Sequence, residues 1–423
     1  MIEDLGVLES IRGQDLFIFT ENTLDFTNPS TYKLFVSSKA LQISIPLSSH
    51  KKDFCELVAA LEVQLDGLII GWDLKNIQSY ILGISGRMFP FKKFYDLKIL
   101  ESYLGYDLPR PTGFAEAVNR LKAIIRHPSW ENLKKIYNTV YIPLITEVVP
   151  KIETLGLGHV GQRKILHPYY EISGQVNGRM KCSNLFSRSF NPHCLTEQDR
   201  HYLRPSDYDN VFMYYDFKNM EVYVLQWLSK DPMLDHVIKS YDDAYLGIWE
   251  VIAGSSNEGS REKCKKIFLP IVFGMGAEMV SKRLECSLSV AEKLKDIIYR
   301  RFKTAMDWVA RYNVAQDGTC VDYFGRIRKF DNEYYKVRNF VIQSPASLIC
   351  LHKLIKLYES IQGLAKVCFH LHDGYAIMTH IRDKDKVAKL GADVLQSEDE
   401  LYSGLKLKVV VEQGPSLDKM EKI

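Results

Sequence analysis

The sequence has no large excess of charge of one sign. Its 423 residues include 55 lysines and arginines against 52 aspartates and glutamates, which leaves a net charge of +3. Overall charge therefore does not indicate a nucleic-acid-binding protein, and any such contact must come from local basic clusters. Each cluster alone is also typical of a solvated surface. The candidates are Arg179–Lys181, Arg261–Lys266, Lys282–Arg283, Arg300–Lys303 and Arg326–Lys329.

Closely spaced cysteines and long apolar runs are also missing. The eight cysteines include no Cys-x-x-Cys pair, so neither a zinc knuckle nor a redox pair is expected. We expect reduced cysteines in a cytoplasmic protein. Met1–Ser10 carries acidic residues and no apolar run, so we expect no signal peptide. No stretch of about 18 uncharged apolar residues occurs, so we expect no membrane span.

What is present is material for two or three globular units. The chain is 46% hydrophobic and 25% charged, and it is long for a single domain. Short apolar runs at Asp15–Thr20 and Gly67–Gly71, with helical spacing at Asp53–Leu65, predict an amino-terminal α/β unit. Apolar residues four apart over Trp130–Glu153 predict a connecting helix, with a kink at Pro143.

The second half of the chain alternates strands and helices. Val211–Tyr215 has the pattern of a strand, and Asp242–Val314 is almost entirely helical. The remaining predicted elements are helices over Glu221–Leu228 and Arg338–Glu359 and hairpins over Gly318–Phe330 and Val367–Met378.

Two aspartates follow strands in a way that suits phosphoryl transfer. Asp216 ends the apolar run Val211–Tyr215, and Asp373 lies at the tip of the second hairpin. Two divalent metals can stabilise the attacking and leaving oxygens of a transferred phosphoryl group, and Mg²⁺ prefers carboxylate oxygens. Taken singly, a strand-end aspartate is more often the cap of the next helix.

A third feature is a stripe of residues four apart, which lie on one face of a helix. It comprises Arg261, Lys265, Leu269 and Phe273. Two cations near a helix start oppose the helix dipole, and a triphosphate along this face would supply the missing negative charge. The alternative is a basic helix that faces solvent, with Leu269 and Phe273 in the core.

In this order the three features resemble motifs A, B and C of family-A DNA polymerases. Tyr215–Glu221 is similar to the motif A pattern Asp-Tyr-Ser-Gln-Ile-Glu. The resemblance implies that Asp216 and Asp373 are the catalytic metal ligands and that Glu221 crowds the sugar 2′ position. It also implies roles for the other residues. Arg261 and Lys265 would hold the incoming triphosphate with Leu269 on the same face, Phe273 would stack near the templating base, and His372 would contact the primer end.

Three shorter matches extend the resemblance to the DNA minor groove. Asn177-Gly178-Arg179 resembles the family's Thr-Gly-Arg, and Asn339 with Gln343-Ser344 resembles its Asn-x-x-x-Gln segment. Gly325-Arg326 resembles the Gly-Arg turn between fingers and palm. The minor groove presents similar acceptors for all correct pairs, so contacts there test pairing without reading sequence. The resemblance spans residues 140 to 415 and implies that Arg179, Arg326, Asn339, Gln343 and His372 bind DNA.

The chain departs from the family pattern at several positions. Leu269 stands where most members carry an aromatic residue, and single-subunit RNA polymerases carry an aliphatic one. Pro270 is expected to kink the helix. Phe273 replaces a tyrosine, and Gly374 replaces the glutamate after the second aspartate. Tyr245 stands near the place of a histidine that contacts the triphosphate.

The amino-terminal unit resembles the family's proofreading exonuclease domain, but with carboxylates missing. Thr20 and Ile77 fill two aspartate positions of the expected motifs, and Glu21 is retained. Tyr103 and Asp107 have the spacing of the last exonuclease motif but follow Ile77 too closely. We expect an inactive exonuclease fold. Hydrolysis of mismatched primers that disappears in an Asp73→Ala, Glu21→Ala double variant would contradict this expectation.

The family's long helical thumb has no counterpart of sufficient length. Only Gly156–Gly174 is available for it, which is too short for two packed helices. Few phosphate contacts imply weak, salt-sensitive DNA binding and short synthesis runs. We therefore expect a processivity factor, helicase or primase as partner. Synthesis of kilobases per binding event by the isolated chain would contradict this.

The predicted fold class is α+β. A right-hand polymerase with an antiparallel palm sheet, helical fingers and a minimal thumb follows an RNase H-like exonuclease-like domain. The predicted parts are the exonuclease-like domain (1–130), connecting helix and thumb (131–175), palm (176–240 and 326–423) and fingers (241–325).

The predicted function is template-directed DNA synthesis without proofreading. The enzyme would use primed template DNA, deoxynucleotides and two Mg²⁺ ions, which Mn²⁺ could replace, in the cytoplasm, or in the host cytoplasm for a phage protein. The alternatives are a primase or RNA-synthesising relative and an inactive DNA-binding scaffold.

Overall fold

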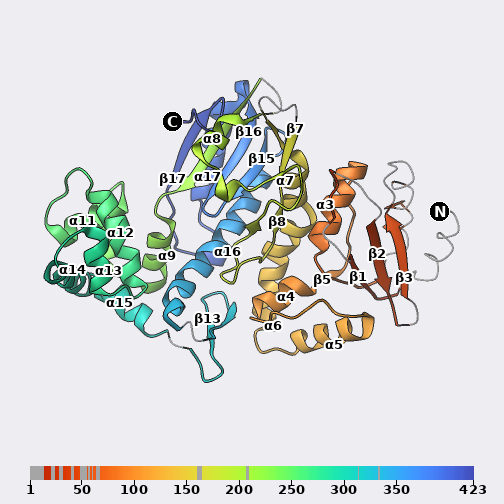
Figure 1. Ribbon diagram of the computed structural model, residues 1–423, viewed down its shortest axis with the longest axis horizontal. Helices are drawn as coiled ribbons and strands as arrows, with labels where there is room; N and C mark the ends of the chain where they lie inside the picture. The colour runs from red at the N-terminus through yellow and green to blue at the C-terminus, as the bar shows by residue number, and fades with distance from the viewer. Residues whose placement is uncertain are drawn as a thin grey trace.

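The computed structural model describes residues 14–20, 24–27, 32–39, 42–47, 55, 58–59, 61–62, 67–159, 164–205, 209–312, 314–331 and 334–423. Figure 1 shows an amino-terminal unit at one end, a group of helices at the other, and a sheet with a long helix between them. Helices and sheets are segregated in this way in α+β proteins, so the predicted fold class is confirmed.

The amino-terminal unit is built on a mixed five-stranded sheet with the order β3-β2-β1-β4-β5. Its strands β1, β4 and β5 are parallel, while β2 and β3 are antiparallel to their neighbours. The two predicted strands are β1 and β4. The predicted helix Asp53–Leu65 falls mostly outside the described residues. The elements are β1 (Leu16–Thr20), β2 (Tyr32–Ser37), β3 (Gln42–Leu47), β4 (Ile69–Gly71), β5 (Phe94–Asp96), α3 (Leu74–Ser85), α4 (Leu97–Tyr103) and α5 (Phe114–Ile125).

The connecting helix is continuous but irregular around Pro143. It consists of α6 (Trp130–Ile136), two π-helical turns, η1 (Tyr137–Tyr141) and η2 (Leu144–Val148), and α7 (Val149–Leu155). Proline lacks the N–H that a regular turn needs, and the widened turns on either side of Pro143 accommodate that loss. The sequence predicts a kink at Pro143, and the structure has a π-helical turn on each side of this residue.

Strands follow the connecting helix. They are β6 (Leu157–His159), β7 (Lys164–Pro168), β8 (Tyr170–Glu171), β9 (Lys181–Cys182), β10 (Ser189–Phe190) and β11 (Leu203–Arg204), with α8 (Glu197–Tyr202) before the last. The described residues of 156–174, where the sequence leaves no room for two thumb helices, contain no helix.

The central sheet is antiparallel, with the order β15-β16-β12-β17-β18. Its strands are β12 (Asn210–Phe217), β15 (Ala365–Leu371), β16 (Gly374–His380), β17 (Val409–Gly414) and β18 (Glu421–Lys422). β12 is the middle strand and is one residue longer at the start and two longer at the end than predicted. The hairpin β15–β16 turns through His372 and Asp373, as the sequence predicts.

Helices α16 (Val337–Ser360) and α17 (Lys384–Gln396) cover one face of this sheet. Tyr215 donates a hydrogen bond to the carbonyl of Val387 in α17, at 2.8 Å. Its cross-strand neighbour Tyr375 donates to the carbonyl of Cys350 in α16, at 2.7 Å. Side chains alternate along a strand, so Tyr214 and Asp216 belong to the opposite face.

The helices that follow β12 lead from the central sheet to the far end of the molecule (Figure 1). They are α9 (Met220–Ser229), α10 (Pro232–Ser240), α11 (Ala244–Ala253), α12 (Ser260–Val272), α13 (Ala277–Leu284), α14 (Leu288–Arg301) and α15 (Lys303–Ala310). α12 continues through Pro270. The predicted hairpin after this group is confirmed as β13 (Thr319–Val321) and β14 (Ile327–Lys329).

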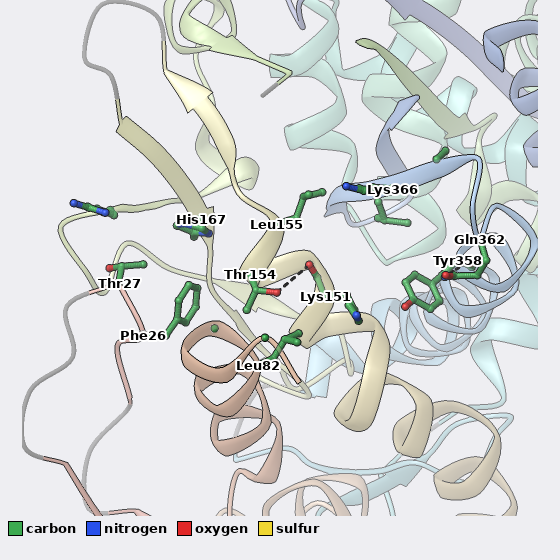
Figure 2. A pocket seen from close by; sticks show the side chains of 15 residues that line it. Phe26, Thr27, Leu82, Lys151, Thr154, Leu155, His167, Tyr358, Gln362 and Lys366 are labelled. Carbon is green, nitrogen blue, oxygen red and sulfur yellow. Dashed lines mark hydrogen bonds between the residues drawn. The ribbon is translucent and has the colours of Figure 1, made fainter. Parts of the chain in front are cut away.

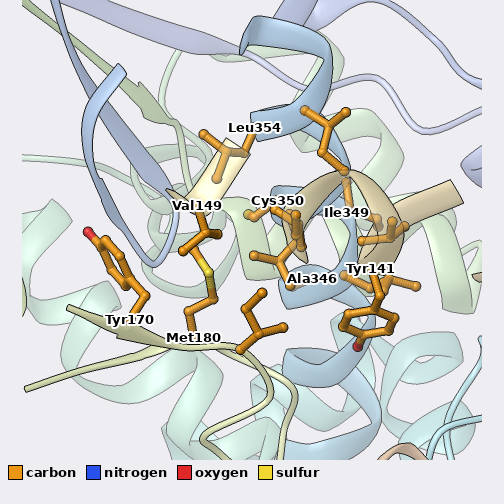
Figure 3. Packing of buried hydrophobic residues seen from close by; sticks show 14 of the residues in the cluster. Tyr141, Val149, Tyr170, Met180, Ala346, Ile349, Cys350 and Leu354 are labelled. Atoms are coloured by element: carbon orange, nitrogen blue, oxygen red, sulfur yellow. The ribbon is translucent and has the colours of Figure 1, made fainter. Parts of the chain in front are cut away.

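The core runs through the middle of the molecule around α16. Figure 3 shows Ala346, Ile349 and Leu354 of α16 packed near Val149 of the connecting helix and Met180 beside β9. By length and composition alone, α16 could cross a membrane, but 89% of its apolar window is buried inside the protein. We therefore interpret α16 as a core helix.

Candidate active site

The two predicted aspartates lie on neighbouring strands of the central sheet. Asp216 pairs with Gly374, the residue directly after Asp373. The backbone N–H of Phe217 donates to the carbonyl oxygen of Asp373 at 3.1 Å. Both aspartates therefore stand at the same end of the sheet, and the side chain of Asp216 belongs to the face that α16 and α17 leave uncovered.

The surroundings of these aspartates favour a bound cation. Burial, followed by the charges of Asp373 and Glu412, raises the pKa of Asp216 to about 7. Burial also raises the pKa of Asp373. The charge of Lys265 opposes both shifts. Two neighbouring carboxyl groups that resist ionisation indicate a site where negative charge is not fully compensated by the protein itself.

The stripe on α12 brings a cation towards the aspartates. Lys265 is exposed, and its charge acts on both carboxyl groups. Nε of Arg261 lies 2.7 Å from Oδ2 of Asp243, which also caps the start of α11. Leu269 is buried and Phe273 is half-buried, so the far end of the stripe packs against the core. Only the near end is therefore available to a polar ligand.

Glu221 joins segments that are far apart in the sequence. Its Oε1 lies 3.2 Å from Nη2 of Arg179 and accepts a hydrogen bond of 2.9 Å from Nε2 of Gln343. Oε1 of Gln343 in turn accepts a hydrogen bond of 3.4 Å from Nδ2 of Asn177. Asn339, four residues before Gln343 in α16, is half-buried. The structure thus connects three predicted nucleotide- and DNA-binding residues in one polar network.

Arg326 lies inside the protein, although the sequence predicts that it contacts DNA. Its side chain is 2% exposed, lies over the ring of Tyr103 and donates a hydrogen bond to Tyr141. A Cβ at Gly178 would lie only 2.7 Å from Nη2 of Arg326. Gly178 also has a φ of +78°, which favours glycine. Arg326 therefore supports the turn that carries Arg179, and it has no exposed surface for DNA.

His372 occupies the turn between the two strands, with a φ of 36°. Its ring centroid is 4.2 Å from that of His193. Burial, followed by the charges of His193 and Arg179, lowers the pKa of His372 to about 4. At neutral pH this imidazole is therefore uncharged.

The structure adds residues that the sequence patterns did not single out. Tyr214 interacts with the carboxyl group of Asp216, and Glu412 stands opposite Tyr214 on β17. Asp243 binds Arg261, and His193 stacks near His372. Tyr214 has a local signal, since residues two apart in a strand share a face. The others come from distant segments and leave no such signal.

Charged residues of the segment that resembles an exonuclease motif form ion pairs within the protein. Nζ of Lys98 lies 3.2 Å from Oδ2 of Asp73, and Nζ of Lys75 lies 3.0 Å from Oε1 of Glu153 in the connecting helix. Ile77 is buried, and Thr20 ends β1. Glu21 lies outside the described residues. Asp73 and Lys75 are thus engaged in ion pairs.

One cavity lies away from the aspartates. It has a volume of about 660 Å³, and its lining contains none of the predicted site residues. Figure 2 shows Lys151, His167 and Lys366 around it, with Leu82 of the amino-terminal unit. Lys366 is near the start of β15, whereas Asp373 follows the other end of that strand.

The described residues contain no cluster of three or more histidine, cysteine or acidic side chains that could hold a metal ion alone. This pattern still suits Mg²⁺, because that ion keeps several waters and is usually bound through one or two carboxylates together with substrate phosphates. The chain thus offers two carboxylates for a cation and a nearby lysine for an anionic ligand.

Comparisons with a family model and with known proteins all point to one family. Residues 115–419 match the family model "DNA polymerase family A". DNA polymerase theta of Drosophila melanogaster is 25% identical over 48% of this chain and 11% of its own length. DNA polymerase I of Helicobacter pylori strain J99 is 23% identical over 67% of this chain and 33% of its own length. The chain therefore spans a third or less of these relatives.

A solved structure shares the fold. The POL domain of Pol1 from M. smegmatis, in complex with DNA primer-template and dNTP, superposes with a TM-score of 0.79. The match covers 98% of both chains at 13% sequence identity. At this identity the likeness concerns the fold alone.

Proposed function

Because the chain belongs to DNA polymerase family A, we propose that it adds deoxynucleotides to a primer 3′ end under the direction of a template. The observation that carries the proposal is the pairing of Asp216 with the residue after Asp373 at one end of the central sheet. The charge of Lys265 reaches both carboxyl groups. Phosphoryl transfer depends mainly on such positioning and charge stabilisation.

Asp216 and Asp373 are the residues that would hold two Mg²⁺ ions, or Mn²⁺ in their place. Their raised pKa values fit this role, because a divalent cation would relieve the repulsion between the two carboxylates. When bound, such ions neutralise charge on the attacking and leaving oxygens.

The remaining residues would position the substrates. Lys265 and Arg261 would bind the triphosphate, with Asp243 holding the guanidinium of Arg261 in place until then. Leu269 and Phe273 would continue that face towards the base pair. Glu221, held by Arg179 and Gln343, would crowd the sugar 2′ position. Uncharged His372 would lie at the primer end.

DNA binding would involve few residues. Arg179, Asn339 and Gln343 would reach the minor groove, and Arg326 would act indirectly through Gly178. We also propose that the exonuclease-like unit does not proofread, because Asp73 and Lys75 are engaged in ion pairs and Thr20 and Ile77 replace acidic residues. Because few residues would contact DNA, a separate partner protein would retain the enzyme on it.

The test is primer extension with Mg²⁺ on a short primed template at low salt. We expect template-directed extension by the wild type and none by Asp373→Ala, because one of two metal-holding carboxylates is removed. Asp385→Ala, on the first turn of α17, is a control that should keep full activity. No extension by the wild type at high enzyme concentration would favour the inactive scaffold or an obligate partner.

A second candidate function is RNA synthesis or priming. The observation that favours it is Leu269, an aliphatic residue on the predicted triphosphate face, whereas Glu221 argues against it. Parallel reactions with ribonucleotides distinguish the two. Preferred incorporation of ribonucleotides would replace the leading proposal with this one.

A further inference from the structure

Gly374 and Tyr214 share one space beside Asp216. A Cβ added to Gly374 would lie 2.1 Å from the hydroxyl oxygen of Tyr214 and 2.6 Å from Cζ. These distances are far below van der Waals contact, so no side chain fits at position 374 while the phenol stays in place. The phenol therefore lies where a side chain at position 374 would begin.

The backbone does not require glycine at this position. The φ of Gly374 lies outside the left-handed region, unlike that of Gly178. Gly374 is the first residue of β16 and pairs regularly with Asp216 and Leu371. The tyrosine ring is thus what excludes a larger residue there.

The tyrosine also contacts the catalytic carboxylate. Tyr214 and Asp216 are two apart on β12 and share a face, and the hydroxyl of Tyr214 lies beside Gly374, which is the cross-strand partner of Asp216. This hydroxyl interacts with the carboxyl group of Asp216. Glu412 stands opposite Tyr214 on β17, so a second acidic residue neighbours Tyr214 in the sheet. Tyr214 also lines a cavity of about 260 Å³ together with Arg200 and Glu412. The ring thus lies among residues of the central sheet, with its hydroxyl beside Gly374.

We infer that Tyr214 is a positioning residue for Asp216 and that it has replaced the acidic side chain expected at position 374. Where that acidic side chain would begin, the site has a neutral hydroxyl, which would orient the carboxylate of Asp216 towards a bound divalent ion. The positioning role rests on the proposed function, because it takes Asp216 as a metal-holding residue. The competition of Tyr214 with a side chain at position 374 for one space is independent of that function.

The first test measures Mn²⁺ binding directly, by electron paramagnetic resonance of free Mn²⁺, with primer extension in parallel. Tyr214→Phe keeps the ring and removes only the hydroxyl. We expect metal affinity and kcat to fall roughly 10-fold to 100-fold, the usual cost of losing a group that orients a metal ligand. The KM for the primer should change little, because the phenol lies beside Asp216 and not on a predicted DNA-contact residue.

The neighbouring tyrosine is a matched control. Tyr215→Phe removes a hydroxyl from the same strand, but that hydroxyl bonds to Val387 on the covered face. It should lower thermal stability slightly and leave Mn²⁺ affinity at the wild-type value. Equal Mn²⁺ affinity in Tyr214→Phe and Tyr215→Phe would overturn the positioning role.

The second test is a thermal-unfolding cycle without metal. Gly374→Ala should lower the unfolding temperature strongly in the wild type and much less in a Tyr214→Ser background, because the space is then free. Tyr214→Ser with Gly374→Glu should recover Mn²⁺ binding that Tyr214→Ser alone loses. Additive effects of the two sites on stability would overturn the exchange, even in an active polymerase.

The two tests separate this inference from the proposed function. If Asp216→Ala leaves Mn²⁺ affinity unchanged, the metal site of the proposed function is wrong and the positioning role is wrong with it. The stability cycle still decides whether Tyr214 and Gly374 compete for one space. If Asp216→Ala abolishes binding and Tyr214→Phe does not affect it, only the positioning role is overturned.

Discussion

At the residue scale, the carboxylate of Glu221 illustrates how one side chain can serve both structure and selection. Arg179 and Gln343 both bind its Oε1, so its position is set by two partners from distant segments. A carboxylate held in this way presents a fixed obstacle to anything placed beside it. If that obstacle faces the sugar of the incoming nucleotide, it would discriminate by size.

Removing this obstacle should relax the choice of sugar. We expect Glu221→Ala to raise the ratio of ribonucleotide to deoxynucleotide incorporation by roughly 10-fold to 100-fold, as for other small steric differences. Single-nucleotide extension with each substrate measures the ratio. Glu221→Gln keeps the volume and the acceptor for Gln343, so it should discriminate like the wild type. An unchanged ratio in Glu221→Ala would contradict the sugar-selecting role.

The residues that sequence could identify are those whose surroundings are local. Asp216 and Asp373 follow strand patterns, so their place beside each other follows from a hairpin and a neighbouring strand. The burial of Arg326 could not be predicted in this way. Its guanidinium packs against Gly178, which is 148 positions earlier in the sequence. The shared face of Tyr214 and Asp216 can be predicted from the strand pattern, but the close approach of the phenol to Gly374 cannot, because it joins positions far apart in the sequence.

At the element scale, predictions from periodicity worked best for long regular elements. α16 was expected over Arg338–Glu359 and extends over Val337–Ser360. Irregular elements were harder, since π-helical turns around Pro143 leave no pattern beyond the proline itself. The periodicity of α16 also does not reveal that two ionisable side chains, His352 and Lys353, are buried within it.

The burial of His352 should make the protein sensitive to acid. Nδ1 of His352 lies 3.2 Å from the hydroxyl of Tyr402 and 4.0 Å from Oδ1 of Asp399. Burial lowers its pKa to about 4, an effect that Lys356 and Lys353 reinforce and Asp399 opposes. The unfolded chain takes up this proton near pH 6.5, so stability is lost as the pH falls from about 6.5 to about 4. The loss is at most roughly 3 kcal/mol.

Urea unfolding at pH 7.5, 6 and 5 tests this sign. His352→Asn keeps an acceptor near Tyr402 but takes up no proton, so its stability should fall less on acidification than that of the wild type. His236→Asn, at an exposed position on α10, should keep the wild-type dependence on pH. If the stability of His352→Asn and of the wild type falls equally on acidification, His352 does not contribute to the loss of stability in acid.

At the scale of the whole molecule, a buried ion pair attaches the amino-terminal unit to the rest of the chain. Lys75 of α3 and Glu153 of α7 are each 1% exposed, with Nζ 3.0 Å from Oε1. Ser79 and the backbone N–H of Tyr170 also donate to Glu153. Lys75 belongs to the segment that resembles an exonuclease motif, so that segment now serves packing between units. The contact gives this segment a structural role that does not depend on hydrolysis.

Breaking this pair should therefore destabilise the whole molecule. Lys75→Met leaves the carboxylate of Glu153 buried without a cation, and we expect a loss of about 3–5 kcal/mol in the free energy of unfolding. Lys239→Met removes the same charge from an exposed pair with Asp235 and should cost about 1 kcal/mol or less. Urea unfolding of both variants gives the comparison. Since neutralising both partners removes the unpaired charge, Lys75→Met with Glu153→Leu should recover part of the loss. If Lys75→Met is no less stable than Lys239→Met, the pair does not hold the two units together, and the unit must be retained for another reason, such as contact with DNA.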